Sequence, residues 1–155
     1  MKGYISIDIP TKPYIKAYII NLLGSEPIMN NDNIFGNKLN DLLLNNRNEF
    51  KDQYYPSTYS TTIRVFITNH IFQHRGCNLN ETNITNFNNF CQTIIKDRFH
   101  QQMDYMISIL PSIEANISEI RAILGIDIES WSDDSMKKDY YRYRKKFGKK
   151  LLYNK

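Results

Sequence analysis

The side chains with the clearest chemical potential in this sequence are the basic and tyrosine residues of its last nineteen positions. Nine lysines and arginines stand there against one acid, Asp139, whereas the other 136 residues carry 11 basic and 15 acidic side chains. The formal charge of +4 thus combines an acidic body with a strongly basic end, an asymmetry that suggests a polyanionic partner. We expect DNA, or alternatively RNA, to be bound by the following residues: Lys137, Lys138, Tyr141, Arg142, Arg144, Lys145, Lys149 and Lys150.

The same tract raises a second kind of chemistry, because three tyrosines and two arginines stand together from Tyr140 to Arg144. Cationic neighbours stabilise a phenolate, which is the nucleophile of tyrosine-dependent DNA nicking enzymes. Metal-using enzymes of this kind share a His-apolar-His pair, and the sequence contains none; it also lacks a glycine-rich phosphate loop. We therefore predict a binding protein without a cofactor. DNA nicking is the less favoured alternative, and a protein-interaction or assembly module whose basic end meets an acidic protein stays open.

Histidine and cysteine side chains in the middle of the chain are the candidates for a metal site. His70, His74 and Cys77 lie close together in the sequence, and Cys91 or His100 could complete a set of four nitrogen and sulfur ligands. Their spacing matches no established zinc pattern, so ordinary packed or surface side chains are the favoured interpretation and no metal is predicted.

The basic residues are expected to lie on one face of a helix that begins after Ser132 and ends near Gly148. Met136, Tyr140, Tyr143 and Phe147 recur at helical spacing and predict the face that packs on the protein body. The cations would then face outward with almost no acidic partners one turn away. If six to eight of them neutralise phosphates, log K should fall with log salt at a slope of about −5 to −7.

The segment before this helix supplies a resemblance. The run Glu119-Ile-Arg-Ala-Ile-Leu-Gly-Ile126 resembles the second helix and turn glycine of helix-turn-helix DNA-binding domains, and the similarity extends over residues 117–146. The resemblance implies that Ser132 to Lys146 form the recognition helix, placed in the major groove. Because Asp133 and Asp134 would repel phosphate at the start of that helix, we expect contact through its middle and C-terminal half.

Hydrophobic periodicity predicts the remaining elements. Alternation indicates two strands that could pair, at 4–9 and 61–68, and residues 46–60 form a loop. Thr11 is the expected cap of the first helix. With the basic helix, about five helices are predicted, the other four at about 12–23, 35–45, 82–110 and 113–124. The fold class is therefore mainly α with a small two-stranded β element (α+β), ending in a helix-turn-helix-like pair.

Size and composition fit one globular domain, at residues 1–148, followed by a basic arm at 149–155. No apolar run reaches the roughly 20 residues of a membrane-spanning helix. Asp8 and Pro10 interrupt the N-terminal apolar stretch, so no secretory signal is predicted. We expect a cytoplasmic protein with free thiols, either monomeric or a homodimer, that acts as a regulator or accessory factor of a mobile element.

Overall fold

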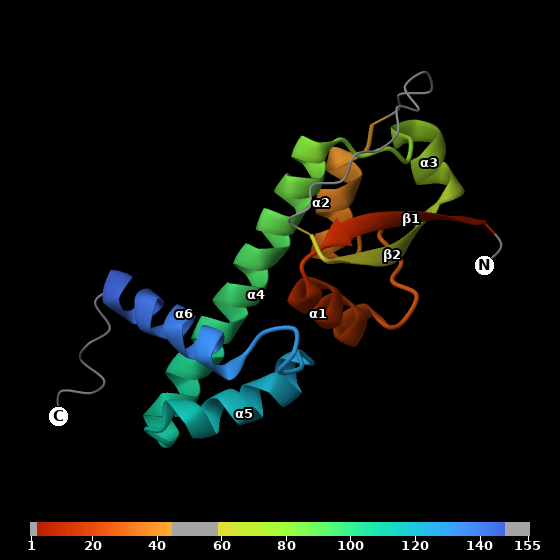
Figure 1. Ribbon diagram of the computed structural model, residues 1–155. Helices are drawn as coiled ribbons and strands as arrows, with labels where there is room; N and C mark the ends of the chain where they lie inside the picture. The colour runs from red at the N-terminus through yellow and green to blue at the C-terminus, as the bar shows by residue number, and fades with distance from the viewer. Residues whose placement is uncertain (1–2, 45–58, 148–155) are drawn as a thin grey trace. The chain divides into compact units, whose positions relative to one another are not determined.

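The computed structural model describes residues 3–44 and 59–147 (Figure 1). These residues form six helices and one antiparallel sheet of two strands, which confirms a mainly α fold with a small β element. The number of helices exceeds the prediction by one. In chain order the elements are β1 (Tyr4–Thr11), α1 (Pro13–Leu23), α2 (Ile34–Leu42), β2 (Thr61–Thr68), α3 (Asn69–Arg75), α4 (Glu81–Ile109), α5 (Ile113–Leu124) and α6 (Asp133–Lys146).

The chain divides into two compact units, with the boundary inside α4 between Thr93 and Ile94. The first unit contains the sheet, α1 to α3 and the first part of α4. The second contains the rest of α4 with α5 and α6. The single domain at 1–148 stays a prediction, and the arm at 149–155 lies outside the described residues. None of the described helices is both long and apolar enough to cross a membrane.

The sheet of the first unit buries one face and exposes the other, as the alternating sequence predicts. Ile7 of β1 pairs with Val65 of β2, and both are buried on this face together with Ile9, Ile63 and Ile67, whereas Ile5 near the start of β1 is partly exposed. On the opposite face Arg64 donates two hydrogen bonds to the carboxylate of Asp8, at 2.8 and 3.1 Å. Both strands are therefore core strands whose polar side chains meet the solvent.

Two local features of the first unit differ from the prediction. β1 continues through Pro10 to Thr11, and the Pro10 carbonyl accepts a hydrogen bond from Asn88 Nδ2 of α4 at 2.9 Å. Lys12, not Thr11, is the N-cap residue of α1, and its backbone N–H donates to Asn88 Oδ1. Thr11 does not cap the helix because α1 begins at Pro13, so that Lys12 occupies the N-cap position and Thr11 lies one residue before it.

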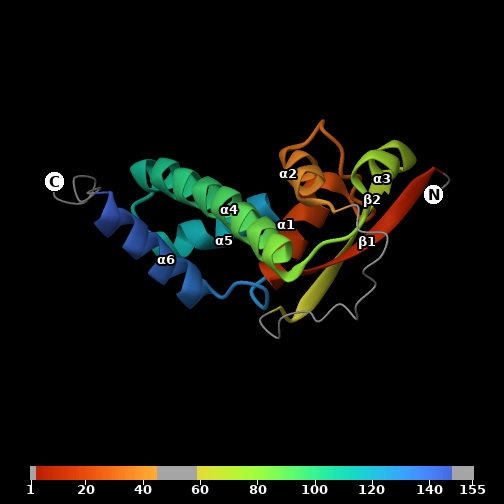
Figure 2. The same ribbon diagram turned by 90° about the horizontal axis from the view of Figure 1, so that it is seen from above.

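The sixth helix, α3, follows β2 without a connecting loop (Figure 2). The Thr68 hydroxyl accepts a hydrogen bond from the Ile71 N–H and caps its start. Gly76, with a φ of 77°, terminates it. Seven residues are too few to show an apolar stripe, which explains why hydrophobic periodicity did not predict this helix.

In the second unit, α6 crosses the C-terminal part of α4, and α5 lies beside them (Figures 1 and 2). The ring of Phe99 on α4 contacts those of Trp131 and Tyr140 in edge-to-face geometry, with centroids 5.0 and 6.2 Å apart. The predicted inner stripe of α6 is confirmed at its start, where Met136 and Tyr140 are buried. It is wrong at its end, because Phe147 is 60% exposed.

Candidate nucleic-acid interface

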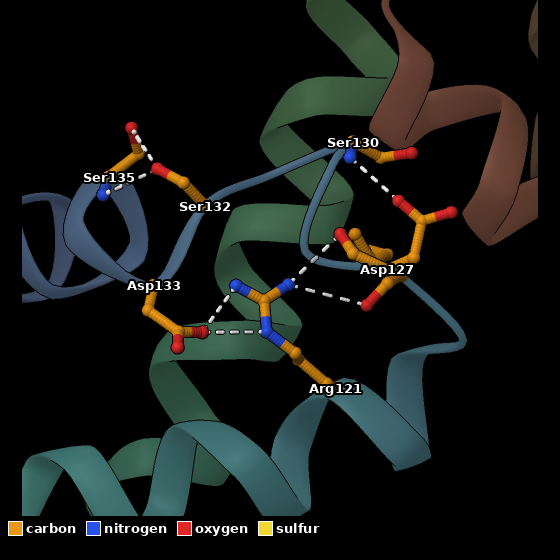
Figure 3. Close-up of polar contacts among 7 residues, drawn as sticks. Arg121, Asp127, Ser130, Ser132, Asp133 and Ser135 are labelled. Carbon is orange, nitrogen blue, oxygen red and sulfur yellow. Dashed lines mark hydrogen bonds and ion pairs between the residues drawn. The ribbon is translucent and has the colours of Figure 1, made fainter.

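α6 starts with the predicted cap. The Ser132 hydroxyl accepts a hydrogen bond from the Ser135 N–H at 3.2 Å and also lies 3.0 Å from the Ser135 hydroxyl (Figure 3). Asp133 and Asp134 occupy the first turn, where their charges complement the helix dipole. The start of the helix is thus well determined by local sequence.

An arginine that the sequence did not single out holds α6 against α5. Arg121 of α5 donates from Nε and Nη2 to Asp133 Oδ1 at 2.8 and 2.6 Å. Its Nη1 donates to the backbone carbonyls of Ile126 and Asp127 at 3.4 and 3.0 Å. Figure 3 shows this guanidinium between the turn and the first residue of α6, and its side chain is only 13% exposed. One side chain therefore fixes a helix, a turn and the next helix together.

The turn itself is closed by Asp127. Its carboxylate accepts a hydrogen bond from the Ser130 N–H at 2.7 Å. Hydrogen bonds from Ser130 lower the pKa of Asp127. This carboxylate therefore stays ionised and holds the turn between Gly125 and Ser132, which is longer than the turn of a compact helix-turn-helix motif.

The two lysines in the first half of α6 have acidic partners, which corrects the expectation for this end of the helix. Lys137 forms an ion pair with Glu114 of α5, and Lys138 forms one with Asp134, one turn earlier, at 2.9 Å. The hydrogen bond between Lys137 and Glu114 lowers the pKa of Glu114 and raises the pKa of Lys137. The first half of α6 is thus nearly balanced in charge.

Asp139, the one acid of the basic tract, points toward α4. Its Oδ1 lies 3.0 Å from Lys96 Nζ, and its Oδ2 lies 2.6 Å from His100 Nε2. Burial raises the pKa of Asp139, but the hydrogen bonds and charges of His100 and Lys96 together outweigh burial, so that the pKa lies below its usual value. The negative charge of the tract is therefore neutralised on the inner side of α6.

The tyrosine cluster is divided between the two faces of the helix. Tyr140 and Tyr143 donate their hydroxyls to the two oxygens of Asp104 on α4, at 2.8 and 2.7 Å. The Tyr143 ring also stacks on His100, with centroids 4.0 Å apart and planes at 12°. A carboxylate acceptor favours the neutral phenol, whereas a nucleophile needs the phenolate. In this cluster only Tyr141 has an exposed ring, at 48%.

Within the described part of α6, the exposed cations that no carboxylate pairs with lie in the C-terminal half, because Lys138, although exposed, is paired with Asp134. Tyr141, Arg142 and Lys145 are exposed as predicted, and Lys146, which was not in the predicted set, joins them. Arg144 is partly buried, with its guanidinium 5.6 Å from the centre of the Tyr140 ring. It is therefore less exposed than Arg142 and Lys145. Two further residues of the predicted contact set, Lys149 and Lys150, lie outside the described part of the chain.

The candidate histidine and cysteine ligands, for which no metal was predicted, do not come together. Within residues 3–44 and 59–147, no group of three or more His, Cys, Asp or Glu side chains is placed to hold a metal ion. His70 and His74 are neighbours on α3. Burial raises the pKa of Cys77 and, much further, that of Cys91, so both thiols stay protonated, and both cysteines are free.

Comparison with known proteins adds no relative to this description. No family model, no curated protein and no solved structure matches the chain. The resemblance of residues 117–146 to helix-turn-helix domains therefore rests on those residues alone.

Proposed function

We propose that this protein binds nucleic acid, with duplex DNA as the first candidate, through the C-terminal half of α6. The observation that carries the proposal is the cluster formed by Arg142, Lys145 and Lys146. All three side chains are exposed, and no carboxylate in the described part of the chain pairs with them. A cationic surface without internal partners is the electrostatic feature that attracts a phosphate backbone.

The spacing of these side chains suits phosphate contacts. Residues three or four positions apart on a helix have Cβ atoms about 5–6 Å apart, so Arg142 can act beside Lys145 and Lys146. The guanidinium of Arg142 can bind one phosphate with two hydrogen bonds, and each lysine supplies a point charge. Tyr141, one turn from Lys145, can contact sugar or a base. Such contacts supply affinity without reading much sequence.

The acidic end of the helix favours one docking direction. Asp133, Asp134 and Glu114 lie around the first two turns and would repel phosphate. Docking through the C-terminal half keeps these carboxylates away from the backbone of the nucleic acid. This direction differs from that of a standard recognition helix, whose N-terminal residues contact the bases.

Paired charge reversals test the proposal. The double variant Arg142→Glu and Lys145→Glu should bind a short DNA duplex at least ten-fold more weakly in a fluorescence anisotropy titration at low salt. The control variant Lys16→Glu and Arg75→Glu changes the net charge equally but alters only the first unit. It should keep most of the affinity, and equal losses in the two variants would contradict a localised interface.

The same titration separates the other partners. Duplex RNA and single-stranded DNA replace the DNA duplex, and an acidic protein serves as a competitor. A complex that resists high salt and is not displaced by DNA would favour the protein-interaction module. A regulatory or accessory role, for a mobile element or otherwise, is the biological setting that we propose for a binding protein of this kind.

A further inference from the structure

A pair of histidines on α3 stands outside the proposed interface and has the geometry of a metal chelate. His70 and His74 are both exposed and lie one helical turn apart. Their ring centres are 4.3 Å apart, and the ring planes are inclined by 55°. Histidines at positions i and i+4 of a helix share one face, which is how helical metal sites bring two imidazoles to one ion.

The separation of the rings indicates which ions fit. A metal about 2.0–2.1 Å from each nitrogen would hold the ring centres roughly 4.5 Å apart if the two metal–nitrogen bonds met near 90°. At the tetrahedral angle, which zinc prefers, the ring centres would be roughly 5.2 Å apart. The separation in α3 is closer to the first value. Angles near 90° belong to the square-planar and octahedral geometries of Cu²⁺ and Ni²⁺.

We propose that His70 and His74 form a two-histidine site for a divalent transition-metal ion of the Ni²⁺ and Cu²⁺ class. Water would fill the remaining coordination positions, because both side chains face the solvent. Arg75 follows His74 directly in the chain, and because adjacent residues do not share a helix face, it lies off the face that carries the two imidazoles.

Cys77 is not a ligand of this site. It follows Gly76, the residue that terminates α3, so it does not continue the face of the two histidines. Burial raises the pKa of its thiol, whereas a metal binds the thiolate. The proposal therefore rests on the two imidazoles alone and is independent of nucleic-acid binding by α6.

Isothermal titration of the full chain with Ni²⁺, and separately with Zn²⁺, tests the site. Cu²⁺ is avoided because it would oxidise Cys77. We expect one Ni²⁺ per chain, bound more tightly than Zn²⁺ and released by acid, because imidazole binds metals in its neutral form. His70→Asn and His74→Asn should each weaken Ni²⁺ binding at least ten-fold, while Cys77→Ser should leave it unchanged.

A spacing control keeps the number of histidines constant. The double variant Phe72→His and His74→Asn places two histidines two positions apart, where they do not face each other, and should also lose binding. Circular dichroism confirms that each variant is folded. The proposal would be overturned if Ni²⁺ binding survived both single histidine substitutions or the spacing control, disappeared with Cys77→Ser, or were absent in the unaltered protein.

Discussion

Asp139 shows how a single residue decides which side of the basic helix carries net charge. It is the one acid of the basic tract, and it contacts Lys96 and His100 of α4 instead of a lysine on its own helix. Because this carboxylate is neutralised from α4, it does not reduce the positive charge of the outer surface. The same contacts attach α6 to α4 within the second unit.

Replacing Asp139 should therefore affect stability before it affects binding. Asp139→Asn keeps the size of the side chain but removes its charge, and hydrogen bonds to charged groups contribute about 1.5–3 kcal/mol each. We expect the free energy of unfolding to fall by about 1–3 kcal/mol in a urea titration at neutral pH. Asp97→Asn, an exposed position on α4, is the matched control and should change little.

The stability difference at Asp139 should depend on pH. The folded-state pKa of Asp139 lies below its unfolded value, so its contribution is present above the unfolded pKa of about 3.9. The contribution is lost as the pH falls through the lower, folded-state pKa. Urea titrations from pH 7 to pH 3 should show the variant approaching the original protein in stability only below about pH 4. A difference that is independent of pH would contradict the role of the ionised carboxylate.

At the scale of elements, Arg121 joins α5, the turn and α6 through one guanidinium. Arg121→Ala removes four donated hydrogen bonds, two of them to the carboxylate of Asp133. We expect faster amide hydrogen exchange in the turn and the first part of α6, and a loss of about 1–3 kcal/mol in stability. Arg98→Ala, an exposed position on α4, is the control. Unchanged exchange at the start of α6 would contradict the positioning role.

Two exposed ion pairs in the first half of α6, one with α5 and one within the helix, should limit the length of the binding surface. Glu114→Gln frees Lys137 and Asp134→Asn frees Lys138, while exposed ion pairs contribute little to stability. Each variant should bind DNA more tightly, and its salt slope should steepen by up to about one unit. Glu119→Gln is the control, because Glu119 is exposed elsewhere on α5 and its replacement measures the effect on DNA binding of removing one negative charge. Weaker binding by both variants would contradict the proposed competition.

The elements could be predicted from sequence wherever periodicity or capping is local. Alternating isoleucines predict the strands. The Ser132 cap and the spacing of Met136 and Tyr140 predict α6. α3 could not be predicted, because it is short and depends on the Thr68 cap and on Gly76 rather than on an apolar stripe.

The features of the candidate site that depend on local sequence could also be predicted. Exposure of Arg142 and Lys145 follows from helical geometry, and the acidic start of α6 is visible in the sequence. The ion pair of Lys137 joins residues 23 positions apart, and the hydrogen bond of Tyr140 to Asp104 joins residues 36 positions apart. Such pairs depend on how the helices pack, which periodicity alone does not specify.

At the scale of the whole molecule, opposite charges are separated along the chain. In the proposed function, the net negative charge of the first 136 residues would disfavour phosphate, and the basic end would be the place where nucleic acid binds. The proposed place is smaller than the whole basic tract, because the lysines in the first half of α6 are already paired. The expected number of phosphate contacts falls accordingly, from the whole tract to its C-terminal part.

The salt dependence of DNA binding tests this central claim most directly. Three unpaired cations in the described part of α6, with up to three lysines beyond it, correspond to about three to six neutralised phosphates. An anisotropy titration of the unaltered protein at several salt concentrations should give a slope of log K against log salt of about −3 to −5. A slope near zero, or no binding to any nucleic acid at low salt, would contradict the account.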